Sequence, residues 1–250
     1  MTAIPKDYQP DSDALADKVI LVTGAGDGIG RVAAIACARH GANVILLGRT
    51  DSKLEAVYDE IETMGYPSAV IFAVDMKDAQ HEDYAALAQG IEQEFGRLDG
   101  LLHNASVLGE RAPLANYKAD LWEAVMHVNV TAQLRLTQAM MPLLEAAPAA
   151  SIIFTSSSVG RRGRAHWGAY AVSKFATEGM MQVLADELEN ISQIRVNSLN
   201  PGATRTRMRA AAYPGENPNT LTSAEDLMPS YLYLLSDASL GVNGQALDAQ

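Results

Sequence analysis

Short apolar runs alternate with longer amphipathic stretches from residue 18 to the end of the chain. The runs have the length of strands and no polar alternation, as expected where helices cover both faces of a sheet. They span residues 19–23, 44–47, 69–74, 98–103, 151–155, 195–199 and 246–248. Helical stretches end near residue 40, run through 54–61, and then cover about 80–95, 117–144 and 168–190. The pattern predicts an α/β fold with a doubly wound parallel sheet of about seven strands and helices on both faces.

The chain divides into an N-terminal extension at residues 1–17 and one domain at residues 18–250. An α/β domain of this length commonly forms one unit, and no repeat or low-complexity linker interrupts it. One irregular stretch, from about Arg207 to Thr222, contains two prolines and a glycine. It predicts a mobile loop between the sixth strand and the next helix.

Charge and cysteine content exclude several classes of protein. The formal net charge of −11 argues against a nucleic-acid partner, because phosphate contacts need a basic surface. The single cysteine, Cys37, has no internal partner for a disulfide and favours a reducing compartment. The polar N-terminus does not resemble a signal peptide, and no apolar run approaches the roughly 20 residues that span a bilayer. We therefore expect a cytoplasmic protein with no nucleic-acid partner, no membrane contact and no bound metal.

A glycine-rich turn follows the first apolar run and leads into the first helix. Gly24, Gly28 and Gly30 give the spacing G-x-x-x-G-x-G, with Asp27 and Ile29 between them. Such a turn lets a pyrophosphate approach the helix N-terminus, where free N–H groups and the helix dipole favour an anion. An ordinary strand-to-helix turn is the alternative, but four glycines within residues 24–30 favour a dinucleotide site in a Rossmann-type fold.

The end of the second strand selects between the two nicotinamide cofactors. An acid there binds the ribose 2′-hydroxyl of NAD, whereas an arginine accommodates the 2′-phosphate of NADP. This strand ends at Arg49 without an acid, which favours NADP. NAD stays open as the alternative, because Arg49 is also an ordinary solvated residue and Asp27 in the turn disfavours a phosphate.

Tyr170 and Lys174 lie four residues apart at the start of the last long helical stretch, on one face of that helix. A free tyrosine titrates near ~10, and a nearby ammonium together with an oxidised nicotinamide favours the phenolate. Ser157 follows the fifth strand, at the edge where parallel sheets present functional residues. The three side chains predict a proton-transfer site in which Tyr170 is the acid or base.

The order of these motifs resembles the short-chain dehydrogenase/reductase family, in its branch of about 250 residues. The resemblance covers nearly everything from Lys18 to Asp248. It rests on the glycine turn, the serine, the tyrosine–lysine pair and further polar and turn residues: Asp75, Asn104, Ala105, Asn129, Asn200, Pro201, Gly202 and Thr206. The stretches Trp167–Tyr170 and Asp248–Gln250 are similar to the YciK-like bacterial oxidoreductases.

The resemblance implies four catalytic residues: Asn129, Ser157, Tyr170 and Lys174. Ser157 would hydrogen-bond the substrate oxygen, and Tyr170 would pass the proton. Lys174 would lower the pKa of Tyr170 and hold the nicotinamide ribose. Asn129 would fix a water between Lys174 and solvent, or else it is a polar residue in a helix kink.

The same resemblance implies a cofactor-binding set along the glycine turn and the later strand ends. Its members are Gly24, Asp27, Gly28, Ile29, Gly30, Arg49, Asp75, Asn104, Tyr170, Lys174, Pro201, Gly202 and Thr206. Asp75 would meet the adenine, Asn104 the adenosine side, and Thr206 the carboxamide. The cofactor carries the hydride chemistry, and the protein supplies position and charge.

Two stretches depart from the family's pattern. His103-Asn104-Ala105-Ser106 stands where the family usually has Asn-Asn-Ala-Gly, and we expect His103 to be a core histidine with satisfied hydrogen bonds rather than an acid or base. The chain ends Asp248-Ala249-Gln250 where the family often has Asp-Gly-Gly, which puts the usual C-terminal subunit contact in doubt.

Three functions fit the sequence. The first is an NADPH-dependent carbonyl reductase, and the second is an NAD-dependent alcohol dehydrogenase with the same site. The third is a non-enzymatic dinucleotide-binding redox sensor, which has no need of the full Asn-Ser-Tyr-Lys set. The first is favoured, and the small-molecule substrate itself is not named by any motif.

Two further expectations concern partners. The stretch after Tyr170 carries Phe175, Met180, Met181, Leu184 and Leu188, a spread too wide for one sheet-facing stripe, and the family pairs this helix with a symmetry mate. We expect a homodimer or homotetramer, with a deeper internal core as the alternative.

Arginines cluster at 161, 162 and 164 and again at 205, 207 and 209, near the carboxyl ends of two strands. Positive charge there predicts an anionic substrate. Contacts with the cofactor's phosphates or with surface acids are the equally weighted alternative.

Overall fold

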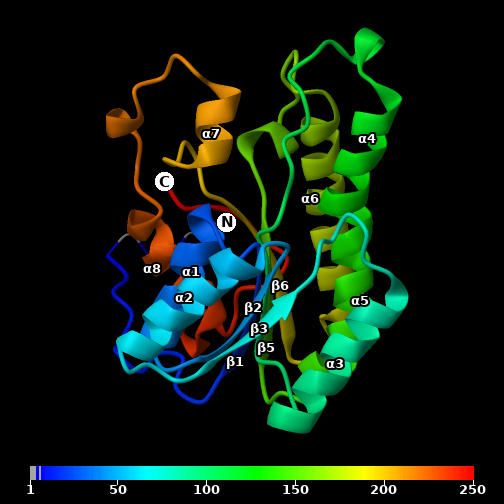
Figure 1. Cartoon of the computed structure of the whole chain (residues 1–250). Helices are drawn as coiled ribbons and strands as arrows, with labels where there is room; N and C mark the ends of the chain where they lie inside the picture. The colour runs from blue at the N-terminus through cyan, green and yellow to red at the C-terminus, as the bar shows by residue number, and fades with distance from the viewer. Residues whose placement is uncertain (1–3, 6) are drawn as a thin grey trace.

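The computed structural model describes residues 4–5 and 7–250 and has a seven-stranded parallel sheet at its centre (Figure 1). The strands are β1 (Val19–Thr23), β2 (Asn43–Gly48), β3 (Ala69–Ala73), β4 (Gly100–His103), β5 (Ala150–Thr155), β6 (Ile194–Asn200) and β7 (Ala246–Asp248). Their order in the sheet is β3-β2-β1-β4-β5-β6-β7, and every pairing is parallel. The predicted α/β fold and doubly wound sheet are confirmed.

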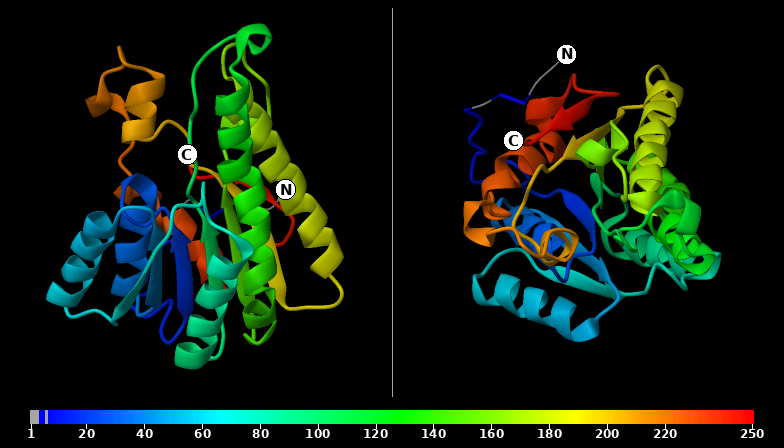
Figure 2. Two further views of the ribbon diagram at one scale, coloured as in Figure 1. Left: turned by 45° about the vertical axis from the view of Figure 1, so that its right-hand side comes forward. Right: turned by 90° about the horizontal axis from the view of Figure 1, so that it is seen from above.

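Helices cover both faces of the sheet (Figure 2). One layer contains α1 (Gly28–Arg39), α2 (Asp51–Thr63) and α8 (Met228–Leu235). The other layer contains α3 (His81–Phe95), α4 (Ala119–Met126), α5 (Ala132–Glu145) and α6 (Gly168–Leu188). A short helix, α7 (Arg207–Ala212), stands beyond the carboxyl ends of the strands, as Figure 1 shows.

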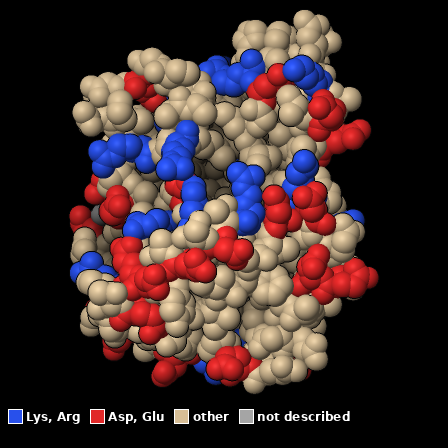
Figure 3. Space-filling view, viewed as in Figure 1, with Lys and Arg blue, Asp and Glu red and all other residues tan. Residues whose placement is uncertain are grey.

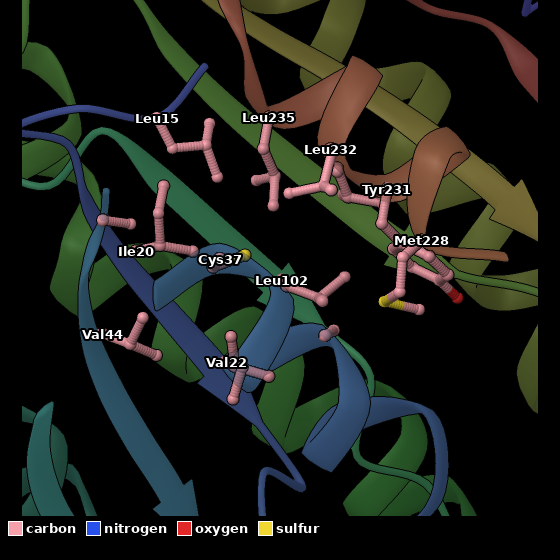
Figure 4. Close-up of a cluster of buried hydrophobic side chains, with 14 of the residues drawn as sticks. Leu15, Ile20, Val22, Cys37, Val44, Leu102, Met228, Tyr231, Leu232 and Leu235 are labelled. Carbon is pink, nitrogen blue, oxygen red and sulfur yellow. The ribbon is translucent and has the colours of Figure 1, made fainter. Parts of the chain in front are cut away.

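Each layer buries its own apolar cluster against the sheet. In the α1 layer, Cys37 lies between β1 side chains such as Ile20 and the α8 residues Leu232 and Leu235 (Figure 4). Burial raises the pKa of the Cys37 thiol to about 12, so it packs as an apolar residue. Leu15, from the predicted N-terminal extension, is fully buried in the same cluster; residues 1–3 and 6 of that extension lie outside the described residues.

Two segments differ from the prediction. The expected single helix over 117–144 is divided into α4, a π-helical segment at His127–Thr131, and α5. The expected loop over 207–222 begins instead with α7, because the hydroxyl of Thr206 accepts a hydrogen bond from the Arg209 N–H at 3.1 Å and caps a run of helix-forming residues.

The strand order reverses direction between β1 and β4, which opens a crevice outside their carboxyl ends. Segments that follow β1, β2, β3, β4, β5 and β6 meet at this edge, so residues far apart in sequence line one crevice. Among the described residues, no helix is both long and apolar enough to cross a membrane.

Candidate active site

A cleft of about 580 Å³ opens at the carboxyl edge of the sheet. It is lined by nearly all the residues that the sequence singled out: Gly24, Asp27, Gly28, Ile29, Arg49, Asp75, Asn104, Ser157, Tyr170, Lys174, Pro201, Gly202 and Thr206. Two of the predicted residues, Gly30 and Asn129, lie behind the lining rather than in it.

The glycine turn forms one wall of the cleft. Gly24 and Gly28 have φ values of 69° and 53°, a region that favours glycine. A side chain on Gly28 would enter the cleft, where its nearest neighbour is the methyl group of Thr206 at 3.7 Å. Gly30 has a packing role. A Cβ at this position would collide with the carbonyl oxygen of Gly24, so the lack of a side chain lets α1 pack against the turn.

Asp27 closes the N-terminus of α1 and is surrounded by positive charge. Its carboxylate accepts a hydrogen bond from the Gly28 N–H at 2.8 Å and forms ion pairs with Lys53 at 2.5 Å and Arg207 at 3.4 Å. Partial burial raises the pKa of Asp27, but these three partners outweigh it and lower that pKa below its usual value. Asp27 therefore opposes a nearby phosphate less than its charge alone suggests.

A group of basic side chains borders the same end of the cleft. Arg49 at the end of β2, Lys53 in α2 and Lys77 after β3 all line it. Within the described residues, no carboxylate forms an ion pair with Arg49. Figure 3 shows Lys and Arg side chains around the hollow in this face. Sequence reasoning found Arg49 but missed Lys53 and Lys77, although Lys53 lies only four residues beyond Arg49, in the first turn of α2.

Ser157, Tyr170 and Lys174 meet at the other end of the cleft. Ser157 and Tyr170 line the cleft together, and the Ser157 side chain acts to lower the pKa of the Tyr170 hydroxyl. Lys174 lies one helical turn beyond Tyr170, with its Nζ 5.6 Å from the centre of the tyrosine ring, and donates a hydrogen bond to the Thr155 carbonyl oxygen at 2.7 Å. The end of β5 and the start of α6 thus bring the three side chains together, as their spacing predicts.

Burial dominates the protonation of this group. It raises the pKa of Tyr170 to about 12, with only the Ser157 hydrogen bond acting in the opposite direction. It lowers the pKa of Lys174 to about 8, while the negative charge of Glu178 raises it. The sequence predicts that Lys174 favours the phenolate, but among the protein's own groups burial outweighs that effect, so Tyr170 is protonated at neutral pH.

Asn129 lies in the π-helical segment and is fully buried. Its side chain accepts a hydrogen bond from the Val107 N–H at 2.8 Å and donates to the Val107 carbonyl at 3.0 Å and to Ser173 Oγ at 3.0 Å. Asn129 therefore fastens the loop after β4 to α6, behind Tyr170. The water between Asn129 and Lys174 stays a prediction.

A family model for short chain dehydrogenases matches residues 18–217 of the chain. The chain is 52% identical over 243 residues to the oxidoreductase YciK of Escherichia coli strain K12, a match that covers 97% of this chain and 96% of that protein. The chain belongs to the short-chain dehydrogenase/reductase family. It is therefore an oxidoreductase of YciK-like type, and the resemblance inferred from the sequence is confirmed.

Solved structures of short-chain dehydrogenases have the same fold. One from Pseudomonas syringae is 56% identical and superposes with a TM-score of 0.95, covering 98% of this chain and all of that chain (100%). One from Escherichia coli CFT073, in complex with NADPH, is 53% identical with a TM-score of 0.93 and covers 96% of this chain and 100% of that one.

The remaining family motifs tie strand ends together at the cleft. The Asn104 side chain donates to the Thr23 carbonyl oxygen at 3.1 Å, and so joins β4 to β1. Asp75 accepts a hydrogen bond from the Lys77 N–H at 3.0 Å. Thr206 caps α7 and faces Gly28 across the cleft. Their assigned contacts with adenine, adenosine and carboxamide stay predictions.

His103, which departs from the family's pattern, is a core residue as expected, but its hydrogen bonds are not all satisfied, because its buried Nδ1 has no partner within the described residues. It is fully buried, stacks on Phe154 at 4.7 Å, and its Nε2 lies 2.8 Å from Thr137 Oγ1. Burial, and secondarily the charge of Lys174, lowers the pKa of His103 to about 3, so its imidazole is neutral at neutral pH.

The two arginine clusters do not form one basic surface at the substrate end. Arg161 is bound by Glu178 at 3.3 Å and Asp248 at 2.9 Å, and Arg209 is paired with Glu216 at 2.6 Å. Of the six arginines, only Arg207 and Arg209 line the cleft. Ion pairing within the chain thus neutralises part of the charge that the sequence suggested was available to a substrate. Within the described residues, no cluster of side chains suits a metal ion.

Proposed function

We propose that the protein transfers a hydride between NADP(H) and a carbonyl or alcohol substrate, with Tyr170 as proton donor or acceptor. The observation that carries the proposal is that Ser157, Tyr170 and Lys174 line one end of a cleft whose other end is a glycine cradle, with Lys174 Nζ 5.6 Å from the centre of the Tyr170 ring. This arrangement needs a cofactor that delivers a hydride between the two ends.

The cradle fits a dinucleotide. Gly28 leaves open the space that a side chain would fill, and the first N–H groups of α1 have no acceptor within their own helix. Ile29 and Gly30 would present such groups to the pyrophosphate. Asp75 and Asn104 would lie along the adenosine, and Pro201, Gly202 and Thr206 along the nicotinamide.

NADP(H) is favoured over NAD(H) by charge. Arg49, with no carboxylate partner among the described residues, lies where a ribose 2′-phosphate would bind, and Lys53 and Lys77 are beside it. Arginine pairs such a phosphate in a fork of hydrogen bonds. The NADPH complex of the 53% identical relative supports the same choice.

The chain's own residues supply the acid and the charge. When bound, NADPH supplies a hydride to the carbonyl carbon and leaves as NADP⁺. The Ser157 hydroxyl donates a hydrogen bond to the substrate oxygen, and Tyr170 gives that oxygen its proton, so that the product is an alcohol. Lys174 holds a positive charge behind Tyr170 and eases the loss of that proton, which is replaced from solvent. Because burial raises the pKa of Tyr170 to about 12, its hydroxyl carries the proton that reduction requires at neutral pH.

A homo-oligomer is part of the proposal. Met181 and Leu188 face the sheet, but Phe175 is 45% exposed on the same helix. Other apolar side chains of α5 and α6 are also exposed, at Leu134, Val172 and Val183. A self-complementary contact through these helices would cover them. A cytoplasmic location is also proposed, on the single unpaired cysteine.

The proposal is tested with a panel of ketones and aldehydes, following oxidation of NADPH and of NADH. Turnover of at least one member, with a higher kcat/KM for NADPH than for NADH, is the expected result. Turnover with NADH preferred would contradict the cofactor assignment. NADPH binding without turnover of any member would favour a dinucleotide-binding protein without catalysis.

A further inference from the structure

The substrate end of the cleft is walled by apolar side chains from four separate segments. Leu108 comes from the loop after β4, Leu121 and Val125 from α4, and Met208 and Ala212 from α7. Trp167, just before α6, completes the wall. Leu108, Met208, Ala212 and Trp167 pack with Tyr170 in one apolar cluster, so the proton donor stands inside this wall.

Trp167 is held rigidly. Its ring lies 5.8 Å from the ring of Tyr170 and 5.9 Å from that of Tyr213, and the guanidinium of Arg111 stacks on it at 5.0 Å. The backbone is left-handed on both sides, with φ of 67° at His166 and 43° at Gly168. A non-glycine residue in that region is uncommon and tends to mark sites where the surroundings fix a geometry for binding.

The arginines near this wall each have a partner within the chain. Arg209 is paired with Glu216 and lies on the Tyr213 ring at 4.0 Å. Arg111 donates to the Ala212 carbonyl oxygen at 2.5 Å while stacking on Trp167 and Tyr213. Arg207 pairs with Asp27 at the glycine turn, toward the phosphate end. A carboxylate on the substrate would therefore leave water for apolar surroundings, which is unfavourable.

We propose that the substrate is an uncharged ketone or aldehyde whose apolar, ring-shaped body lies against the ring of Trp167. The inference rests on the proposed carbonyl reductase activity and narrows it. It replaces the anionic substrate that the arginine clusters suggest. Shape and burial, rather than charge, then select the substrate, because Trp167 and the apolar side chains beside it in the lining give a planar or alicyclic group an apolar surface to pack against.

The test uses two ketones of similar shape, para-isopropylacetophenone and para-acetylbenzoate, with NADPH. We expect kcat/KM to be at least about tenfold higher for the uncharged ketone, because Arg207 and Arg209, the arginines of the lining near this wall, are already paired with carboxylates and leave the substrate no unpaired cation in the described lining. Met208→Arg supplies that cation and should raise kcat/KM for para-acetylbenzoate, a gain that misfolding cannot produce. Arg162→Ala, outside the cleft lining, should leave the ratio between the two ketones unchanged.

Two substitutions, Trp167→Phe and Trp167→Ala, distinguish a role of the Trp167 ring in substrate binding from a role in folding. Trp167→Phe keeps a ring and should retain most of kcat/KM for the uncharged ketone. Trp167→Ala should lower it about tenfold or more, as loss of a buried aromatic anchor does. The dissociation constant for NADPH, measured by calorimetry, should not change in either variant, since Trp167 lies at the far end of the cleft.

Failure of this inference differs from failure of the proposed function. Preference for para-acetylbenzoate, reduced in Arg162→Ala or Arg207→Ala, would overturn the uncharged substrate while supporting the reductase. Absence of turnover with both ketones would count against the reductase for this class of carbonyl compound. In that case calorimetry of each ketone with the enzyme–NADP⁺ complex still decides: tighter binding of the uncharged ketone supports the inference, and equal or weaker binding overturns it.

Discussion

A buried carboxylate, Glu178, lies one helical turn beyond Lys174. It accepts hydrogen bonds from Ser156 Oγ at 2.5 Å and Ser198 Oγ at 2.7 Å, and from Arg161 Nε at 3.3 Å. These partners hold the carboxylate between β5, β6 and α6. Because its negative charge opposes the effect of burial on the pKa of Lys174, we propose that Glu178 is a positioning residue for the ammonium of Lys174.

This arrangement predicts a pH dependence. Burial lowers the pKa of Lys174 to about 8, so kcat/KM for ketone reduction should fall as the pH rises through about 8 and the lysine loses its proton. Glu178→Gln removes a charge that favours the ammonium and should move this fall to lower pH. The check is the pH profile of kcat/KM, with Glu187→Gln on the exposed side of α6 as control. An unmoved profile would mean that Glu178 serves the fold alone.

A second prediction at this scale concerns the cofactor. Arg49→Asp should shift the ratio of kcat/KM from NADPH toward NADH by about tenfold or more, because a hydrogen bond to a charged group contributes about 1.5–3 kcal/mol. Arg39→Asp, at the far end of α1, makes the same charge change away from the cleft and should not alter the ratio. If both variants behave alike, Arg49 is only a solvated side chain.

At the scale of elements, the division between α4 and α5 is the most informative departure from the sequence pattern. The π-helical segment His127–Thr131 turns Asn129 toward Val107, which is 22 residues away along the chain. This one side chain satisfies both the backbone N–H and the backbone C=O of Val107.

Asn129→Ala should therefore lower the free energy of unfolding by about 1–3 kcal/mol, the cost of leaving buried polar groups without partners. Denaturant titration measures it. Asn129→Asp keeps an acceptor for the Val107 N–H but loses both donated hydrogen bonds. Comparison of its free energy of unfolding with that of Asn129→Ala shows how much the accepted bond contributes. A loss below about 0.5 kcal/mol for the alanine variant, the size of an ordinary surface substitution, would contradict the structural role.

Sequence periodicity was enough to predict the strands, because β1, β2, β4, β5 and β6 are buried almost throughout and therefore appear in the sequence as unbroken apolar runs. Spacing was likewise enough for Tyr170 and Lys174, which share one helix. It failed where the deciding contact is distant in sequence. The hydrogen bonds of Asn129 with Val107, the ion pair of Lys53 with Asp27, and the carboxylates that neutralise Arg161 all join separate elements.

At the scale of the whole molecule, the exposed apolar side chains of α5 and α6 predict self-association. Light scattering at micromolar protein should give at least twice the mass of the chain, which is 26.7 kDa. Val183→Glu, at a residue 58% exposed on α6, should lower that mass, since a charge in a self-complementary contact is repeated by symmetry. Ile191→Glu, at an exposed residue beyond the end of α6, is the matched control. A monomeric mass for the unaltered chain would contradict the proposal.

The central claim is that Tyr170 passes the proton while the rest of the cleft binds the cofactor, and Tyr170→Phe tests it most directly. The phenyl ring keeps its packing against Trp167, but the hydroxyl that Ser157 contacts is gone. The measurement is kcat for ketone reduction together with the dissociation constant for NADPH in the same variant. We predict that kcat falls at least about 100-fold, the lower end of general acid–base contributions, while the dissociation constant is nearly unchanged. A variant that kept most of its kcat would contradict the account.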